Sequence, residues 1–158
     1  TPGRGTIHVN ALPAGEHVIF SGIAGQDLTK RKAVKPRNMP PSSTASPGVL
    51  YGDTFYLSAK SGFIPGQGIV TKDFDLQLRQ TMRNLLDGLE EADMNFSSVV
   101  SAVVYLKDMK QHYDPMNQLY RTFFKDAFPA RTTIQQNQDR ETQTEEQISF
   151  IAVQGTTP

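Results

Sequence analysis

The chain has 158 residues, and its 16 basic side chains balance 16 acidic ones. A length of this kind is typical of one domain that buries its core without disulfides. Zero net charge argues against duplex nucleic acid or an anionic membrane as a partner. The absence of cysteine excludes disulfides, thiol nucleophiles and thiolate zinc sites. No apolar run reaches the roughly 18 residues of a membrane span.

The first 45 residues differ in character from the rest. Residues 6–9 and 17–20 predict two short strands, joined by the turn-forming Leu12-Pro13-Ala14-Gly15. Residues 25–45 are rich in proline and basic side chains, which predicts a solvated linker. Residues 1–24 also repeat the end of the chain: Arg4, Thr6, Ile7, Asn10, Ser21, Ile23 and Ala24 recur as Arg131, Thr133, Ile134, Asn137, Ser149, Ile151 and Ala152. We therefore expect residues 1–24 to be a partial copy of the last strands of a domain.

The main domain is expected over residues 46–154, with a tail at 155–158. Residues 49–51 and 54–59 predict a hairpin around Gly52-Asp53. A long helix follows, capped by Thr71 or Asp73, with a core-facing stripe of Phe74, Leu78, Met82, Leu85, Leu89 and Ala92.

The second half predicts a strand, a helix and two further strands. Residues 99–106 are β-branched and aromatic, as in a buried strand. Asp114-Pro115 predicts the start of the second helix, with the aspartate as N-cap. Residues 132–135 and 147–153 predict the closing strands. Two amphipathic helices cover one side of one sheet, and strand 99–106 is apolar on both sides, so we expect its free face to pack on another subunit.

Several segments in this order resemble the Rid family (reactive intermediate deaminases, also called YjgF or L-PSP endoribonucleases). They are residues 52–58, 99–109, 117–124 and above all the signature-like Pro129-Ala130-Arg131-Thr132-Thr133-Ile134-Gln135. The resemblance implies an α+β, chorismate-mutase-like fold with one mixed β-sheet and two helices on one face. It also implies a homotrimer whose sheets close a barrel, with a cleft for a small carboxylate-bearing metabolite at each subunit interface.

The resemblance assigns roles to four residues. The signature arginine, which binds the substrate carboxylate in the family, matches Arg131. This role suits a guanidinium, which pairs with a carboxylate through two hydrogen bonds and stays charged. The serine-glycine after the second strand becomes Ser58-Ala59. The water-activating glutamate of the last strand becomes Ser149, whose hydroxyl is a poor base without an activating neighbour.

Three functions stay open at this point. The first is a deaminase that hydrolyses reactive 2-imino acids to 2-oxo acids, with its catalytic residue unknown because Ser149 replaces the glutamate. The second is a non-catalytic trimer that binds a small carboxylate. The third is an L-PSP-type endoribonuclease or translation inhibitor, against which the neutral charge counts.

We expect no metal and no cofactor. His8, His17 and His112 are too scattered for a metal motif, and no Lys-Ser or Lys-Thr follows the glycines at 66 and 68 to form a phosphate loop. A cytoplasmic protein is expected, although the chain begins at Thr1 and an earlier leader stays open.

Overall fold

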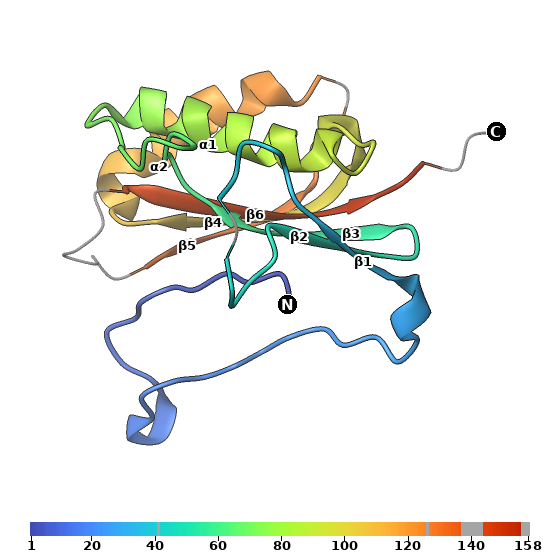
Figure 1. Ribbon diagram of the computed structural model, residues 1–158. Helices are drawn as coiled ribbons and strands as arrows, with labels where there is room; N and C mark the ends of the chain where they lie inside the picture. The colour runs from blue at the N-terminus through green and yellow to red at the C-terminus, as the bar shows by residue number, and fades with distance from the viewer. Residues whose placement is uncertain (41, 126, 137–143, 156–158) are drawn as a thin grey trace.

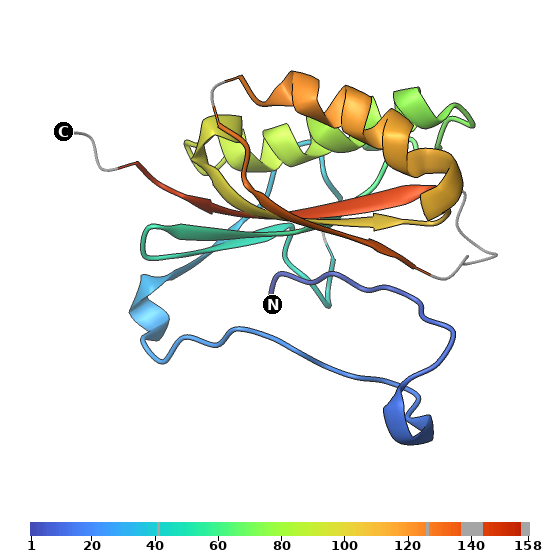
Figure 2. The same cartoon turned by 180° about the vertical axis from the view of Figure 1, so that it is seen from behind.

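One mixed sheet carries both α-helices on the same face (Figures 1 and 2). The computed structural model describes residues 1–40, 42–125, 127–136 and 144–155. The sheet has six strands in the order β1-β2-β3-β6-β4-β5. All neighbours are antiparallel except β4 and β5, which are parallel. The expected α+β architecture, with one mixed sheet and two helices on one side, is confirmed.

The first half of the domain is a hairpin followed by a long helix. β2 (Gly48–Tyr51) and β3 (Thr54–Lys60) are joined by Gly52-Asp53, as predicted. Gly52 has φ +62°, a conformation that glycine adopts without steric cost. Helix α1 (Phe74–Glu90) begins at Asp73, whose side chain accepts a hydrogen bond from the Leu76 amide at 2.9 Å. Its predicted stripe is buried from Leu78 to Leu89.

The second helix begins earlier than predicted. Helix α2 spans Met109–Tyr120, and Asp108 caps it by accepting a hydrogen bond from the Gln111 amide at 2.9 Å. The prediction that Asp114 caps this helix is wrong, because Pro115 lies inside it. Asp108 follows β4 directly and offers the first carboxylate that can satisfy free amide groups at the helix start.

The closing strands take the two remaining places in the sheet. β4 (Val99–Leu106) has the predicted bounds, and α2 connects it to the parallel β5 (Ala130–Gln135) at the sheet edge. β6 (Glu146–Val153) inserts between β3 and β4. Side chains alternate along β6: Glu146, Ile148, Phe150 and Ala152 are buried under the helices, and the residues between them point to the other face.

The N-terminal segment contains none of the predicted strands. Residues 6–9 and 17–20 are extended or irregular, with a short 3-10 turn, η1 (Pro13–Gly15), between them. Both strand predictions are therefore wrong. β composition alone does not make a strand, which also needs a neighbouring chain to pair its amide and carbonyl groups. The segment instead runs beneath the helix-free face of the sheet (Figure 1). Whether residues 1–24 are a partial copy of a preceding domain stays a prediction.

The segment predicted as a linker contributes an edge strand. β1 (Arg31–Val34) pairs with β2, and Val34 enters the core with 3% of its surface exposed. The strand is short, and the proline and basic residues around it indicated an irregular linker instead. The sheet therefore begins at residue 31, ahead of the expected boundary at 46.

One carboxyl group is buried in the layer between sheet and helices. Glu146 is fully buried at the start of β6, and the Thr81 hydroxyl of α1 donates a hydrogen bond to its Oε1 at 2.5 Å. Its Oε2 has no hydrogen-bond partner among the residues that the structure describes. Burial raises the pKa of Glu146 to about 8, against which the Thr81 hydrogen bond acts as the smaller effect.

We expect the stability of the fold to decrease as pH rises from about 5 to about 8. An unfolded glutamate loses its proton near pH 4.3, whereas folded Glu146 keeps its proton up to about pH 8. In this window the folded chain binds one proton more, so raising the pH favours unfolding. Glu146→Gln should remove on the order of 1 kcal/mol or more of this pH dependence. Urea titrations at pH 5, 6, 7 and 8 measure it. Exposed Glu16 provides the control Glu16→Gln, and identical pH slopes for wild type and Glu146→Gln would contradict the prediction.

Candidate functional site

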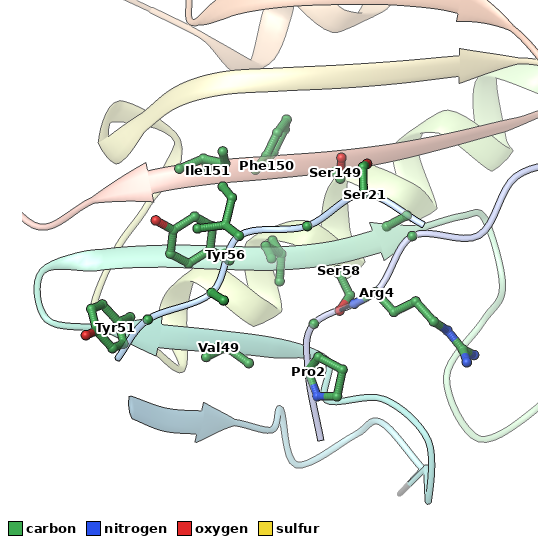
Figure 3. Close-up of a pocket in the computed structure, with 18 of the residues that line it drawn as sticks. Pro2, Arg4, Ser21, Val49, Tyr51, Tyr56, Ser58, Ser149, Phe150 and Ile151 are labelled. Atoms are coloured by element: carbon green, nitrogen blue, oxygen red, sulfur yellow. Dashed lines mark hydrogen bonds between the residues drawn. The ribbon is translucent and has the colours of Figure 1, made fainter. Parts of the chain in front are cut away.

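A cavity of about 620 Å³ lies between the helix-free face of the sheet and the N-terminal segment (Figure 3). The sheet contributes Tyr51, Tyr56 and Ser58 from β2 and β3, and Ser149 and Ile151 from β6. The N-terminal segment contributes Arg4, Ser21 and Ile23 among others. The floor of this cavity is therefore the sheet face that the helices leave uncovered.

Ser58 ties the N-terminal segment to the sheet. Its hydroxyl donates a hydrogen bond to the Ser46 carbonyl at 2.6 Å and accepts one from the Arg4 amide at 2.8 Å. Ser46 continues this connection, because its amide donates to the Pro2 carbonyl at 2.7 Å. Ser58 is 8% exposed. Its hydroxyl, to which the sequence assigned a role in substrate binding, therefore has a structural role: it holds the N-terminal segment on the sheet.

Ser149 points into the cavity, on the face away from the helices. Its neighbours Ile148 and Phe150 are buried in the core, so alternation along β6 places Ser149 on the opposite side. Its position in the sheet is opposite Val103 of β4. Ser21, its counterpart in the repeat, lines the same cavity. Ser149 is thus accessible to a small molecule.

A second cavity of about 390 Å³ shares Arg4, Ser58 and Ala59 with the first. It extends from the end of β3 to the loop before β2, and it includes Lys60, Asn84 and Gln147. The Lys60 amine donates a hydrogen bond to the Pro47 carbonyl at 3.1 Å. Burial lowers the pKa of Lys60 to about 8. Figure 3 shows the side chain of Arg4 pointing away from Tyr51 and Tyr56.

Arg131 lies elsewhere, on the helix-covered face of the edge strand β5. It is opposite Ala102, which is a core residue. Its guanidinium donates to the Asn117 Oδ1 at 2.6 Å and lies 5.0 Å from the ring centroid of Tyr120. Burial raises the pKa of Tyr120 to about 12, although the charge of Arg131 acts in the opposite direction. Asn117 and Tyr120 therefore hold a half-buried guanidinium at the edge of the sheet.

The structure brings together three of the four residues selected from the sequence. Ser58, Ala59 and Ser149 line one cavity. Arg131 points to the opposite face, and β4 separates its strand from β6. Within one chain, therefore, Arg131 and Ser149 do not share a site.

Comparisons with known proteins place this geometry in a family. A model of the family described as Endoribonuclease L-PSP matches residues 36–154. The chain belongs to this family. It is 33% identical over 96 residues to a RutC family protein of Sulfurisphaera tokodaii, covering 60% of this chain and 76% of that relative. It is 32% identical over 91 residues to 2-iminobutanoate/2-iminopropanoate deaminase of Homo sapiens, covering 57% and 66%.

Solved structures of the L-PSP family share the fold. The crystal structure of the E. coli YjgF gene product superimposes with a TM-score of 0.71 at 26% identity, covering 78% of this chain and 99% of that one. Yeast Mmf1 gives a TM-score of 0.73 at 21% identity, covering 79% and 99%. The family that sequence analysis identified by its motifs is thus confirmed.

The described part of this family member has no obvious metal centre or membrane helix. Over residues 1–40, 42–125, 127–136 and 144–155, no cluster of three or more His, Asp or Glu side chains could hold a metal ion. In the same ranges no helix is long and apolar enough to cross a bilayer.

Sequence analysis missed Arg4 and Lys60 as candidate site residues. Arg4 lies in a segment assigned to a partial repeat, and Lys60 follows Ser58-Ala59 by one position without forming a motif. The only sequence signal is that adjacency to Ser58-Ala59. The side chains gather in one cavity because the N-terminal segment folds back over β3, which no local pattern reveals.

Ser58→Ala should loosen the N-terminal segment. The variant removes both hydrogen bonds of the hydroxyl, and we expect it to lower the free energy of unfolding by about 1–3 kcal/mol. Amide hydrogen exchange of Arg4 should accelerate, since its N–H loses its acceptor. Ser101→Ala is the matched control, because Ser101 of β4 lies on the same helix-free face of the sheet as Ser58. Unchanged exchange at Arg4 in Ser58→Ala would show that the hydroxyl does not hold this segment.

Proposed function

We propose that this chain hydrolyses small 2-imino acids to 2-oxo acids and ammonia, in a site shared between copies of a homotrimer. Relatives that are 32% identical carry the name 2-iminobutanoate/2-iminopropanoate deaminase, which supports this reaction class. The observation that carries the proposal is the state of Arg131. Its guanidinium is oriented by its neighbours, yet no carboxylate among the residues of the described ranges lies within ion-pair distance of it.

Arg131 is suited to hold the carboxylate of an imino acid. Asn117 occupies one terminal nitrogen, and the face of Tyr120 supports the plane of the guanidinium. Because the group is half-buried, a carboxylate that pairs with it is less screened by water than at an open surface. Tyr120 also buries a hydroxyl without a hydrogen-bond partner among the described residues, so a polar ligand beside Arg131 would find a second donor.

A site that unites Arg131 with the helix-free face needs a second copy. Arg131 belongs to β5, whose outer edge is unpaired by the described strands. The helix-free face also carries apolar side chains, such as Tyr56 and Ile151, that the single chain leaves partly exposed. In the proposed trimer, the β5 edge of one copy meets the sheet of the next. The substrate then lies between Arg131 of one copy and the Ser149 side of its neighbour.

Hydrolysis adds water to the carbon of the C=N bond and releases ammonia, which leaves a 2-oxo acid. Fixing the carboxylate fixes the position of that carbon, and positioning alone supplies a large part of many rate enhancements. Ser149 offers a hydroxyl that can orient the water but not strongly deprotonate it. We therefore expect slow turnover, and binding without turnover is the alternative that the replacement of glutamate by Ser149 favours.

Arg131→Ala should abolish imine hydrolysis and the binding of 2-oxo acids while the chain stays folded. A dehydratase that releases 2-aminoacrylate provides the substrate, and the rate of 2-oxo acid formation above the spontaneous rate measures activity. Calorimetry with 2-oxobutanoate measures binding, and sedimentation measures the oligomer, which we expect to be a trimer in both proteins. Arg121→Ala, an exposed arginine at the end of α2, is the matched control.

Two results would contradict this assignment. Unchanged binding in Arg131→Ala would remove Arg131 from the site. Binding without acceleration in wild type would replace the deaminase with a carboxylate-binding protein.

A further inference from the structure

Lys60 is a partly buried lysine whose amine contacts a backbone carbonyl and no carboxylate among the described residues. It is the last residue of β3 and pairs with Ile148 of β6 after a register shift between Leu57 and Lys60. Its amine donates one hydrogen bond to a backbone carbonyl, that of Pro47. The other lysines with a resolved partner contact carboxylates, as Lys107 contacts Glu145 at 3.5 Å. Lys60 has no such ion pair among the described residues.

The cavity around Lys60 contains cations and no acids. Arg4 and Lys60 both line it, and its other polar residues are hydroxyls and amides, such as Ser61, Asn84 and Gln147. No aspartate or glutamate is found among its lining residues. A volume of about 390 Å³ suits a small metabolite. The charges favour an anion, because the Arg4 guanidinium and the Lys60 amine meet no carboxylate among the residues that line this cavity.

The amine of Lys60 is available as a nucleophile near neutral pH. Because burial without a counter-charge disfavours the ammonium form, the pKa falls to about 8, and a substantial fraction of the amine is unprotonated at physiological pH. Lysines in such surroundings form Schiff bases with carbonyl compounds.

We propose that Lys60 forms a reversible Schiff base with a small 2-oxo acid bound in the cavity that it shares with Arg4. Arg4 pairs with the carboxylate, and the carbonyl carbon faces the amine. The ligand class rests on the proposed function, since a 2-oxo acid is the product of imine hydrolysis. The site itself lies within one chain and does not involve Arg131.

The bond changes balance without a further reactant. The amine lone pair attacks the carbonyl carbon, and the nitrogen transfers a proton to the oxygen to give a carbinolamine. Its hydroxyl then leaves as water as the C=N bond forms. The reverse steps, in which water adds to the C=N carbon and the carbinolamine expels the amine, release the 2-oxo acid and restore Lys60.

Trapping with cyanoborohydride tests the proposal directly. The intact chain is incubated at pH 7.5 with 2-oxobutanoate and the reductant, which converts a Schiff base into a stable secondary amine. Peptide mapping by mass spectrometry then locates the adduct and separates Lys60 from the α-amino group and the other lysines. We expect labelling of Lys60 to be at least about tenfold faster than that of exposed Lys30, because a pKa of about 8 leaves far more of the Lys60 amine unprotonated than the usual lysine pKa of about 10.4 would.

Variants divide the roles of the two cations. Lys60→Arg keeps the positive charge and should lose the adduct, whereas the control Lys30→Arg should keep it. Arg4→Gln should slow trapping of 2-oxobutanoate at Lys60 without slowing trapping of propanal, which has no carboxylate. Equal slowing of both compounds would overturn the role of Arg4.

The trapping experiment and the hydrolysis assay test the two proposals separately. If 2-oxobutanoate labels Lys60 no faster than Lys30 in the wild-type chain, the Schiff-base site is wrong, and this result needs no variant to fold. A labelled Lys60 in a chain that does not accelerate imine hydrolysis would support the site and remove the proposed deaminase. Accelerated imine hydrolysis without preferential labelling of Lys60 would support the proposed deaminase and contradict the Schiff-base site.

Discussion

The helices of this protein bury only one face of the sheet, and this constraint determines where every candidate residue lies. Residues that alternate along β6 divide between a dry layer under α1 and a face open to other contacts. Ile148 and Phe150 enter the dry layer, and Ser149 between them is thereby directed outward. The same alternation on β5, with Arg131 opposite the buried Ala102, directs the guanidinium to the helix side. A strand exposes its side chains in only two directions, so these positions cannot be exchanged without shifting the register by one residue.

Much of the fold could be predicted from the sequence because its signals are local. The spacing from Leu78 to Leu89 indicates one buried helix face, and Gly52-Asp53 indicates the tight hairpin. The family could be identified for the same reason, since residues 129–135 form a contiguous motif. The wrong predictions are at places where the local sequence fits more than one structure. Asp108 and Asp114 are both good caps, and only the distance from the end of β4 decides between them. Residues 17–20 have the composition of a strand, but no strand in the described part of the chain pairs with them.

The candidate site was harder to predict because it depends on contacts between distant segments. The substrate-binding role assigned to Ser58 stays a prediction: Ser58 lines the cavity, and its hydroxyl bonds to the backbone of Arg4 and Ser46. Arg4 and Lys60 are separated by more than fifty positions in the sequence, and they line one cavity only because the N-terminal segment crosses β3. No carboxylate lines the cavity that holds these two cations, so their charges can act on a bound anion. Burial lowers the pKa of the Lys60 amine to about 8, and this amine donates to a backbone carbonyl, whereas the Lys107 amine contacts a carboxylate.

The position of β6 in the sheet has a consequence for how the chain reaches this structure. β6 is synthesised after the other five strands of this sheet, yet it occupies an interior place between β3 and β4. Until it arrives, the hairpin of β2 and β3 and the β4-α2-β5 unit have no shared hydrogen bonds, and both keep an open edge. The sheet can therefore be completed only after synthesis has passed residue 153, and its assembly depends on contacts of high sequence separation, which form slowly. During that interval the open edges of β3 and β4 can pair with the strands of other chains.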